Sequence, residues 1–286
     1  MIASTTMNLL SNYNILYINL DSRTERRENI ESQLRARGLL SRSDLITHRI
    51  SGVVGSDLSD PDYAQSLADE FGVDLEKMTP DYWLSRKNFK TMCNNKDKVI
   101  GQVGCYLAHL RAIKWAVDND LDNVIILEDD CVILGEDDED VEFPEPPETA
   151  EMFYLGGLFW HQTKEISEIK KTQHWLKIDP SVLKIACAFG YGFNTTRSLI
   201  NVHTLLTNVW LDGKGKDKPR DWRTSGQRIR ATAVDIMFVN FIQKMGEAYI
   251  LSQPKMVQSD AFISDVTDVG KKTPKKPCGH AYFYKK

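Results

Sequence analysis

The chain has few cysteines, and they form no pattern. Five are present, an odd number, and no two lie in a Cys-x-x-Cys pair; they are Cys93, Cys105, Cys131, Cys187 and Cys278. This argues against the disulfide framework of a small secreted domain and against a zinc site of the usual cysteine spacing. We therefore expect a reducing compartment and predict a cytoplasmic protein.

Long apolar runs and a dominant charge are missing too. No stretch approaches the roughly 18 apolar residues needed to cross a bilayer, and residues 1–11 lack the basic and apolar segments of a secretory signal. The net charge is −4, from 36 basic and 40 acidic residues, so no overall field favours nucleic acid. The 286 residues are 42% hydrophobic, which is enough for a substantial core.

The hydrophobic pattern predicts an α/β protein. Residues 15–20 are an apolar run typical of a buried strand, and residues 23–37 are rich in helix formers, with Asp21 and Ser22 as a cap. Later strands are expected at residues 48–50, 124–127, 152–155, 185–193 and 249–257, and later helices at residues 103–117, 195–208 and 234–245. This order favours a parallel or mixed sheet with helical crossovers.

Polar stretches separate and follow these elements. Residues 52–80 are expected to be irregular, with Pro61 and Pro80 as breaks. Residues 136–151 hold nine acids and no bases, which predicts a solvated loop; a calcium site is the alternative, without the glycine of an EF-hand. We predict one domain over residues 1–270 and a basic tail over residues 271–286.

The most informative segment is a run of three acids after a predicted strand. Glu128, Asp129 and Asp130 follow the apolar residues 124–127, at the edge of an α/β sheet where ligands collect. Crowded carboxylates repel one another, so a cation is expected, and oxygen ligands favour Mg²⁺ or Mn²⁺. Alternation places Glu128 and Asp130 on one side and Asp129 on the other. A solvated acidic turn is the alternative.

Three segments, in this order, resemble the motifs of glycosyltransferase family 25. They are residues 17–23 with residues 25–27 (Tyr-Ile-Asn-Leu-Asp-Ser-Arg, then Glu-Arg-Arg), residues 104–110 (Gly-Cys-Tyr-Leu-Ala-His-Leu) and residues 126–130 (Ile-Leu-Glu-Asp-Asp). Weaker similarity continues at residues 190–192, 234–235 and 264–265. The family includes lipooligosaccharide galactosyltransferases and the collagen hydroxylysine galactosyltransferases.

The resemblance implies a GT-A-type fold, a Rossmann-like mixed sheet flanked by helices in a single catalytic domain. It implies transfer of a hexose, galactose or glucose, from a UDP-sugar to a hydroxyl of a glycan or hydroxylysine-type acceptor, with inversion and with Mn²⁺ or Mg²⁺. The chemistry of sugar transfer explains the need for a metal, because a cation neutralises the negative charge that develops on the leaving diphosphate. A base must also take the proton of the acceptor hydroxyl.

The resemblance also suggests roles for individual carboxylates. Asp130 is the expected metal ligand, and Glu128, where the family pattern has Asp, is expected at the metal or the ribose. Asp265 is preferred over Asp260 as the late residue that completes the site. Asp235 is the candidate general base; its alternative is an acid that complements the dipole of a helix N-terminus.

Donor binding is assigned to the first strand and its turn. Tyr17, Asn19 and Arg23 are the candidates there, together with Glu128 and Asp129. The neighbouring Arg26 and Arg27 are equally well explained as charges on a solvated helix face. His109 is expected to be a buried histidine with a satisfied ring, ahead of a metal ligand.

Two other functions compete with the transferase. A haloacid-dehalogenase-like phosphatase would use Asp21 as nucleophile, but it needs a second aspartate where this chain has Arg23. A non-catalytic protein of the same fold that binds a nucleotide-sugar or glycan is the other alternative. The absence of a secretory signal and of an ER retention tetrapeptide favours a bacterial or viral source.

Overall fold

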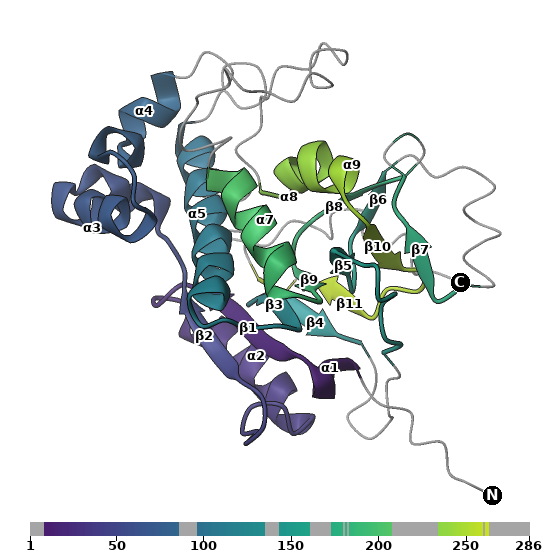
Figure 1. The fold of residues 1–286 in the computed structure, drawn as a ribbon. Coiled ribbons are helices and arrows are strands. Elements are labelled where there is room, and N and C mark those ends of the chain that lie inside the picture. The colour runs from purple at the N-terminus through teal and green to yellow at the C-terminus, as the bar shows by residue number, and fades with distance from the viewer. Residues whose placement is uncertain are drawn as a thin grey trace, which may run out of the picture.

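A seven-stranded mixed sheet forms the centre of the protein (Figure 1). The computed structural model describes residues 9–85, 96–134, 143–160, 173–179, 181, 183–207, 234–259 and 261–262. In spatial order the strands are β2 (Thr47–Ser51), β1 (Asn14–Asn19), β3 (Val124–Glu128), β9 (Gly190–Phe193), β5 (Met152–Tyr154), β10 (Ala248–Leu251) and β7 (Trp175–Lys177). The predicted mixed α/β architecture is thereby confirmed.

The first three strands of the chain in this sheet run parallel. β1 pairs with β2 on one side and with β3 on the other, in a register that places Ile18 opposite both Ile50 and Glu128. β9 is antiparallel to both of its neighbours, β3 and β5. Because β1 and β3 are parallel and in register, the residues that follow them meet at one edge of the sheet.

Helices cover both faces of this sheet. The α-helices are α1 (Leu9–Asn12), α2 (Thr24–Ala36), α3 (Pro61–Phe71), α4 (Pro80–Ser85), α5 (Lys96–Asp118), α7 (Thr196–Leu206), α8 (Val234–Met237) and α9 (Gln243–Met245). Short 3-10 turns are η1 (Gly55–Ser59) and η2 (Leu75–Met78), and a π-helical turn, η7 (Phe238–Ile242), joins α8 to α9. Figure 1 shows α5 beside α7 on one face, and α3 and α4 lying beyond α5.

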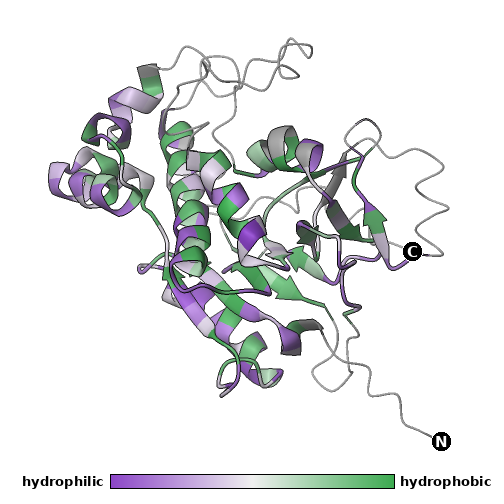
Figure 2. Ribbon diagram, in the orientation of Figure 1, coloured by the Kyte–Doolittle hydropathy of each residue, from purple (hydrophilic) through white to green (hydrophobic). Residues whose placement is uncertain are grey.

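Alternate residues of the central strands enter two separate cores. Leu16 and Ile126 pack with α5, α7 and α8, whereas Ile15 and Ile125 pack with α2 on the opposite face. All four are fully buried. The buried middle of each strand is therefore apolar on both faces, as the continuous hydrophobic runs predict, and β3 is mainly hydrophobic in Figure 2.

The prediction that residues 52–80 are irregular is wrong. They contain α3, which begins after Asp60, whose side chain accepts hydrogen bonds from the N–H groups of Asp62 and Tyr63. Pro61 occupies the first turn, where its missing N–H costs nothing, and Gly72 ends the helix in the left-handed conformation with φ 65°. The apolar residues at helical spacing were present in the sequence: Ala64, Leu67, Ala68 and Phe71 are buried.

Two further expectations need correction. The predicted strand over residues 185–193 is two strands, β8 (Lys184–Ala186) and β9, which belong to different sheets and are separated at Cys187, with φ 72°. Residues 143–151 are not a fully solvated loop, since Phe143 is completely buried against the α2-side core. Residues 135–142 and the predicted tail, residues 271–286, lie outside the described residues.

Two small sheets complete the fold. β4 (Cys131–Ile133) pairs antiparallel with β11 (Met256–Gln258), with Gln258 opposite Cys131. β6 (Leu158–Trp160) pairs with β8. The first of these pairs matters most here, because it brings a late segment of the chain against the three acids. Among the described helices, none is long and apolar enough to span a membrane.

Candidate active site

The side chains of the three consecutive acids contact three different parts of the fold. Asp129 faces β1 and α2: the amide Nδ2 of Asn19 donates to its Oδ2 over 2.8 Å, and Nη1 of Arg26 donates to its Oδ1 over 3.2 Å. Burial raises the pKa of Asp129, and the bonds from Asn19 and Arg26 oppose that rise. The charge of the buried Asp129 carboxylate is therefore stabilised by groups of the protein itself, Asn19 and Arg26.

Arg26 is a buried partner of Asp129, so the solvated-face alternative is wrong for this residue. Its side chain is 8% exposed, and its guanidinium lies 5.4 Å from the ring centroid of Phe262. The neighbouring Arg27 is exposed instead and pairs with Glu31 over 2.7 Å. An amphipathic pattern alone does not distinguish these two arginines.

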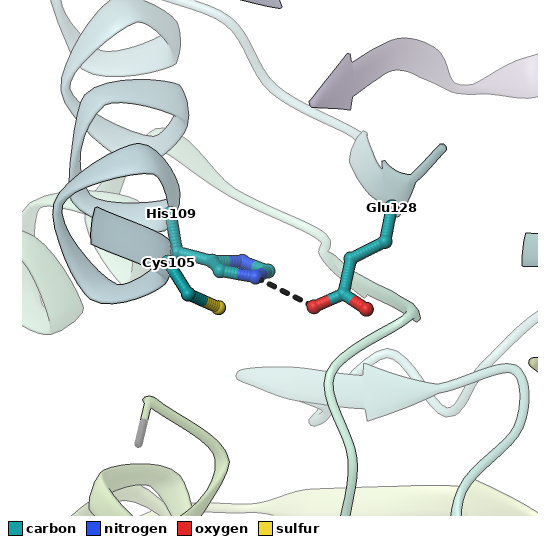
Figure 3. Close-up of side chains that lie close together, drawn as sticks. All are labelled: Cys105, His109 and Glu128. Carbon is teal, nitrogen blue, oxygen red and sulfur yellow. Dashed lines mark hydrogen bonds and ion pairs between the residues drawn. The ribbon is translucent and has the colours of Figure 1, made fainter. Parts of the chain in front are cut away.

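Glu128 contacts the helix on the other face of the sheet. Its Oε1 lies 3.0 Å from Nε2 of His109, and Nδ1 of that ring lies 2.9 Å from the hydroxyl of Tyr191 (Figure 3). His109 is 1% exposed, whereas the side chain of Glu128 is 23% exposed. The expectation of a buried histidine with both ring nitrogens bonded is confirmed. Glu128 and Asp129 face different elements, as strand alternation predicts.

Asp130 is buried, and half of its carboxylate is uncompensated. Its Oδ2 accepts a hydrogen bond from Nε2 of Gln258 over 3.0 Å, and its backbone carbonyl accepts from the N–H of Ser259. Among the described residues, none donates a hydrogen bond to Oδ1. Burial first, and then the charge of Glu128, raises the pKa of Asp130 to about 7. A buried oxygen without a donor, beside a second carboxylate, fits a bound divalent cation.

A second set of potential metal ligands adjoins this carboxylate pair. Ligand atoms of Cys105, His109 and Glu128 all lie within 4.8 Å of one another (Figure 3). However, burial, followed by the charges of Glu128, Asp235, Asp130 and Asp129, raises the pKa of the Cys105 thiol well above its usual value. The sulfur of Cys105 is also a soft ligand, which suits Mg²⁺ or Mn²⁺ less well than carboxylate oxygens do. Both nitrogens of His109 are also engaged, so Glu128 and Asp130 fit a hard cation better.

Asp235 lies close enough to act electrostatically on the same cluster. It is half-buried in the first turn of α8, and its Oδ2 accepts a hydrogen bond from the backbone N–H of Cys187 over 3.1 Å. Its charge raises the pKa of both Cys105 and Tyr154, after burial as the main cause. The fold thus brings Asp235 toward the acids of β3, although more than 100 residues separate them in the sequence.

The predicted donor-binding residues differ in their exposure. Tyr17 is 4% exposed on the α2 side, where its hydroxyl donates to Glu31 over 2.6 Å, and burial raises its pKa to about 12. Asn19 is 1% exposed, and its Nδ2 also donates to the carbonyl of Arg23. The side chain of Arg23 is partly exposed. Asp265 and Asp260 lie outside the described residues.

Several residues of this network were not assigned from the sequence. Nε of Arg49 donates to Oδ1 of Asn19 over 3.1 Å, and its Nη2 forms an ion pair with Asp21. Nothing in the pattern of β2 indicates this role. Gln258 follows a predicted extended segment, and Tyr191 lies in a segment similar to the family, so both carried a weak signal.

The acids at the edge of the sheet belong to a sugar-transferring enzyme. The chain belongs to glycosyltransferase family 25, whose model, described as that of an LPS biosynthesis protein, matches residues 12–195. The matched region includes Asn19, Arg26, His109, Tyr191 and the three acids, and it excludes Asp235 and Gln258. No curated protein matches the chain significantly. Family membership favours the transferase over the phosphatase and the non-catalytic alternatives.

We expect Asp129→Asn to destabilise the fold strongly. The substitution keeps the shape but removes the carboxylate charge that faces buried Arg26, and loss of one partner of a buried ion pair costs about 3 kcal/mol or more. Urea unfolding measures the effect. As control, Asp118→Asn breaks the exposed pair with Lys114 and should cost less than about 1 kcal/mol. Equal losses in the two variants would contradict a structural role for Asp129.

We expect Asp130→Asn to stabilise the metal-free protein at high pH only. The folded pKa of about 7 is above the ordinary 3.8, so the wild type loses stability as pH rises through this interval. Asparagine stays neutral at every pH. The free energy of unfolding of the variant should therefore be higher than that of the wild type by about 1 to 4 kcal/mol at pH 8, and equal to it near pH 4. Urea unfolding in EDTA across this range measures both. A difference that is independent of pH would refute the assignment.

Proposed function

We propose that the protein is a metal-dependent hexosyltransferase with a GT-A-type fold. It moves galactose or glucose from a UDP-sugar to a hydroxyl of a glycan or protein acceptor, with inversion at the anomeric carbon and with Mn²⁺ or Mg²⁺ bound. The observation that carries the proposal is the buried Oδ1 of Asp130, which has no hydrogen-bond partner in the described part of the chain and lies next to Glu128 at the carboxyl end of β3. Ligands of α/β sheets bind at this edge.

The carboxylates of Glu128 and Asp130 would hold the cation. When bound, it neutralises the charge that appears on the diphosphate as the bond to the anomeric carbon breaks. Asp265 is the proposed third ligand. In support, β11 reaches Asp130 through Gln258 and Ser259, a few residues before Asp265.

The proposed donor site uses residues in two ways. Arg23 and Glu128 are partly exposed. Arg23 is proposed to contact the diphosphate, and Glu128 is proposed to contact the ribose or the metal. Tyr17, Asn19 and Asp129 are buried, and they are proposed to hold the ends of β1 and β3 in the arrangement that the donor requires. The hydrogen bonds from Asn19 to Asp129 and to Arg23 support this division, since they connect the buried residues to the exposed turn.

Asp235 is the proposed general base. In a single displacement, the acceptor oxygen bonds to the anomeric carbon while the bond to the diphosphate breaks, and the hydroxyl proton passes to Asp235. The base then lies opposite the leaving group, which gives inversion. The hydrogen bond from the N–H of Cys187 holds one oxygen of Asp235 in place.

The donor is identified by thermal stabilisation with a panel of nucleotide-sugars, each with and without Mn²⁺. A ligand at about 100 times its dissociation constant stabilises the folded state by roughly 2.7 kcal/mol. We therefore expect Tm to rise by several degrees with one UDP-hexose and Mn²⁺ together. Asp130→Asn is the control and should lose the Mn²⁺-dependent part. A rise in Tm that is the same with and without Mn²⁺, or no rise in Tm in a folded sample, would overturn the proposal.

Asp235→Asn should separate catalysis from binding. Asparagine still offers an oxygen to the N–H of Cys187 but cannot take a proton, so kcat should fall by about 10² to 10⁴. The KM for the donor should stay within about twofold, because Asp235 is proposed to act on the acceptor. Steady-state kinetics measure both quantities.

The matched variant is Asp235→Ala, which also removes the hydrogen bond to Cys187. It should lose as much kcat and about 1 kcal/mol more stability than Asp235→Asn. If Asp235→Asn instead raises the donor KM while kcat is unchanged, Asp235 belongs to the donor site.

A further inference from the structure

A buried chain of hydrogen bonds leads from the interior of the sheet to Glu128. We propose that His109 is a positioning residue that fixes the carboxylate of Glu128, and that Tyr191 orients His109. The inference rests on the proposed function, because it gives Glu128 its place at the cation.

The bonds along this chain run in one direction when Glu128 is ionised and the ring of His109 is neutral. An ionised Glu128 can only accept, so Nε2 of His109 must carry the proton that is donated to Oε1 over 3.0 Å. Nδ1 of the neutral ring then accepts from the hydroxyl of Tyr191 over 2.9 Å. Burial raises the pKa of Tyr191 well above its usual value, so the hydroxyl keeps its proton. Both ring nitrogens of His109 then have a hydrogen-bond partner.

The arrangement leaves one oxygen of Glu128 for a ligand. Within the described residues, Oε2 accepts no hydrogen bond, and Figure 3 shows it pointing away from His109. A glutamate side chain has several rotatable bonds, and this one is only partly buried. Its orientation therefore has to come from a neighbour, and the neighbour is a ring from the middle of α5 that is 1% exposed.

Two glycines let Tyr191 reach His109. A Cβ at Gly192 would lie 2.3 Å from the ring of Phe153 and 2.8 Å from the carbonyl oxygen of Val124, and one at Gly190 would lie 2.7 Å from the sulfur of Met256. With side chains at these positions, β9 could not approach its neighbours so closely. The two glycines thus have a physical role: they let β9 pack closely against its neighbours, and the hydroxyl of Tyr191 on that strand then meets His109 of α5.

The ring of Tyr191 is itself fixed by aromatic neighbours. Phe193 and Phe238 contact it edge-on, with ring centroids at 5.7 and 5.2 Å. Tyr191 is fully buried. The hydroxyl is therefore held in one place, and replacing it by hydrogen should alter the orientation of His109 with little change in packing.

Tyr191→Phe is the primary test and Tyr154→Phe its matched control. Both remove one hydroxyl from a fully buried tyrosine, but the hydroxyl of Tyr154, on the neighbouring strand, bonds to Gln243 and is not a member of the chain that ends at Glu128. Mn²⁺ affinity in the presence of UDP is measured by the EPR signal of free Mn²⁺, without turnover. We expect Tyr191→Phe to weaken Mn²⁺ binding by about 10-fold and His109→Phe by about 10- to 100-fold. Tyr154→Phe should leave it within about twofold.

A Glu128→Gln background distinguishes positioning from general structural support. There, Tyr191→Phe and His109→Phe should each add less than about a twofold loss, because both act through the carboxylate. Losses that multiply in this background, or equal Mn²⁺ affinities for Tyr191→Phe and Tyr154→Phe, would overturn the positioning role alone. A wild-type protein that binds no Mn²⁺ with UDP would overturn the proposed function, and this inference with it.

Discussion

Repulsion among three consecutive carboxylates is the constraint on which the rest of this structure depends. Two of them, Asp129 and Asp130, are buried, and the third is partly buried beside them. The fold separates their charges by directing each to a different neighbour: Arg26 and Asn19, His109, and Gln258. Among the described residues, Oδ1 of Asp130 is a buried carboxylate oxygen without a hydrogen-bond partner, and the account of function rests on that oxygen.

Each of these contacts also fixes an element of the fold. The pair with Arg26 ties α2 to the end of β3, the bond with His109 ties α5 to it, and the bond with Gln258 holds β11 over it. The parallel register of β1 with β3 adds Asn19 to the same edge. Residues that stabilise the fold are therefore the same residues, or direct neighbours of the residues, that are proposed to bind the ligand.

Local patterns in the sequence predicted the features that depend on local chemistry. The apolar runs gave β1 and β3, helical spacing gave α5, and Thr195 caps α7 as expected. The same kind of signal is present for α3 in Asp60, Pro61 and Gly72, within a segment that is polar overall. Contacts between residues far apart in the sequence are harder to predict. Arg26 and Asp129 are 103 residues apart, and the helical pattern does not distinguish Arg26 from Arg27. The role of Tyr191 needed the register of β9 against β3, which no local pattern contains.

The most direct test of the account is the position of Mn²⁺ in a crystal of the protein with Mn²⁺ and UDP, located by anomalous scattering at the manganese edge. The account predicts one strong peak bonded to Oδ1 of Asp130, with Glu128 bound directly or through one water, and with His109 still bonded to Glu128. A peak coordinated by Cys105 and His109, or an ordered UDP with no manganese at Asp130, would contradict it.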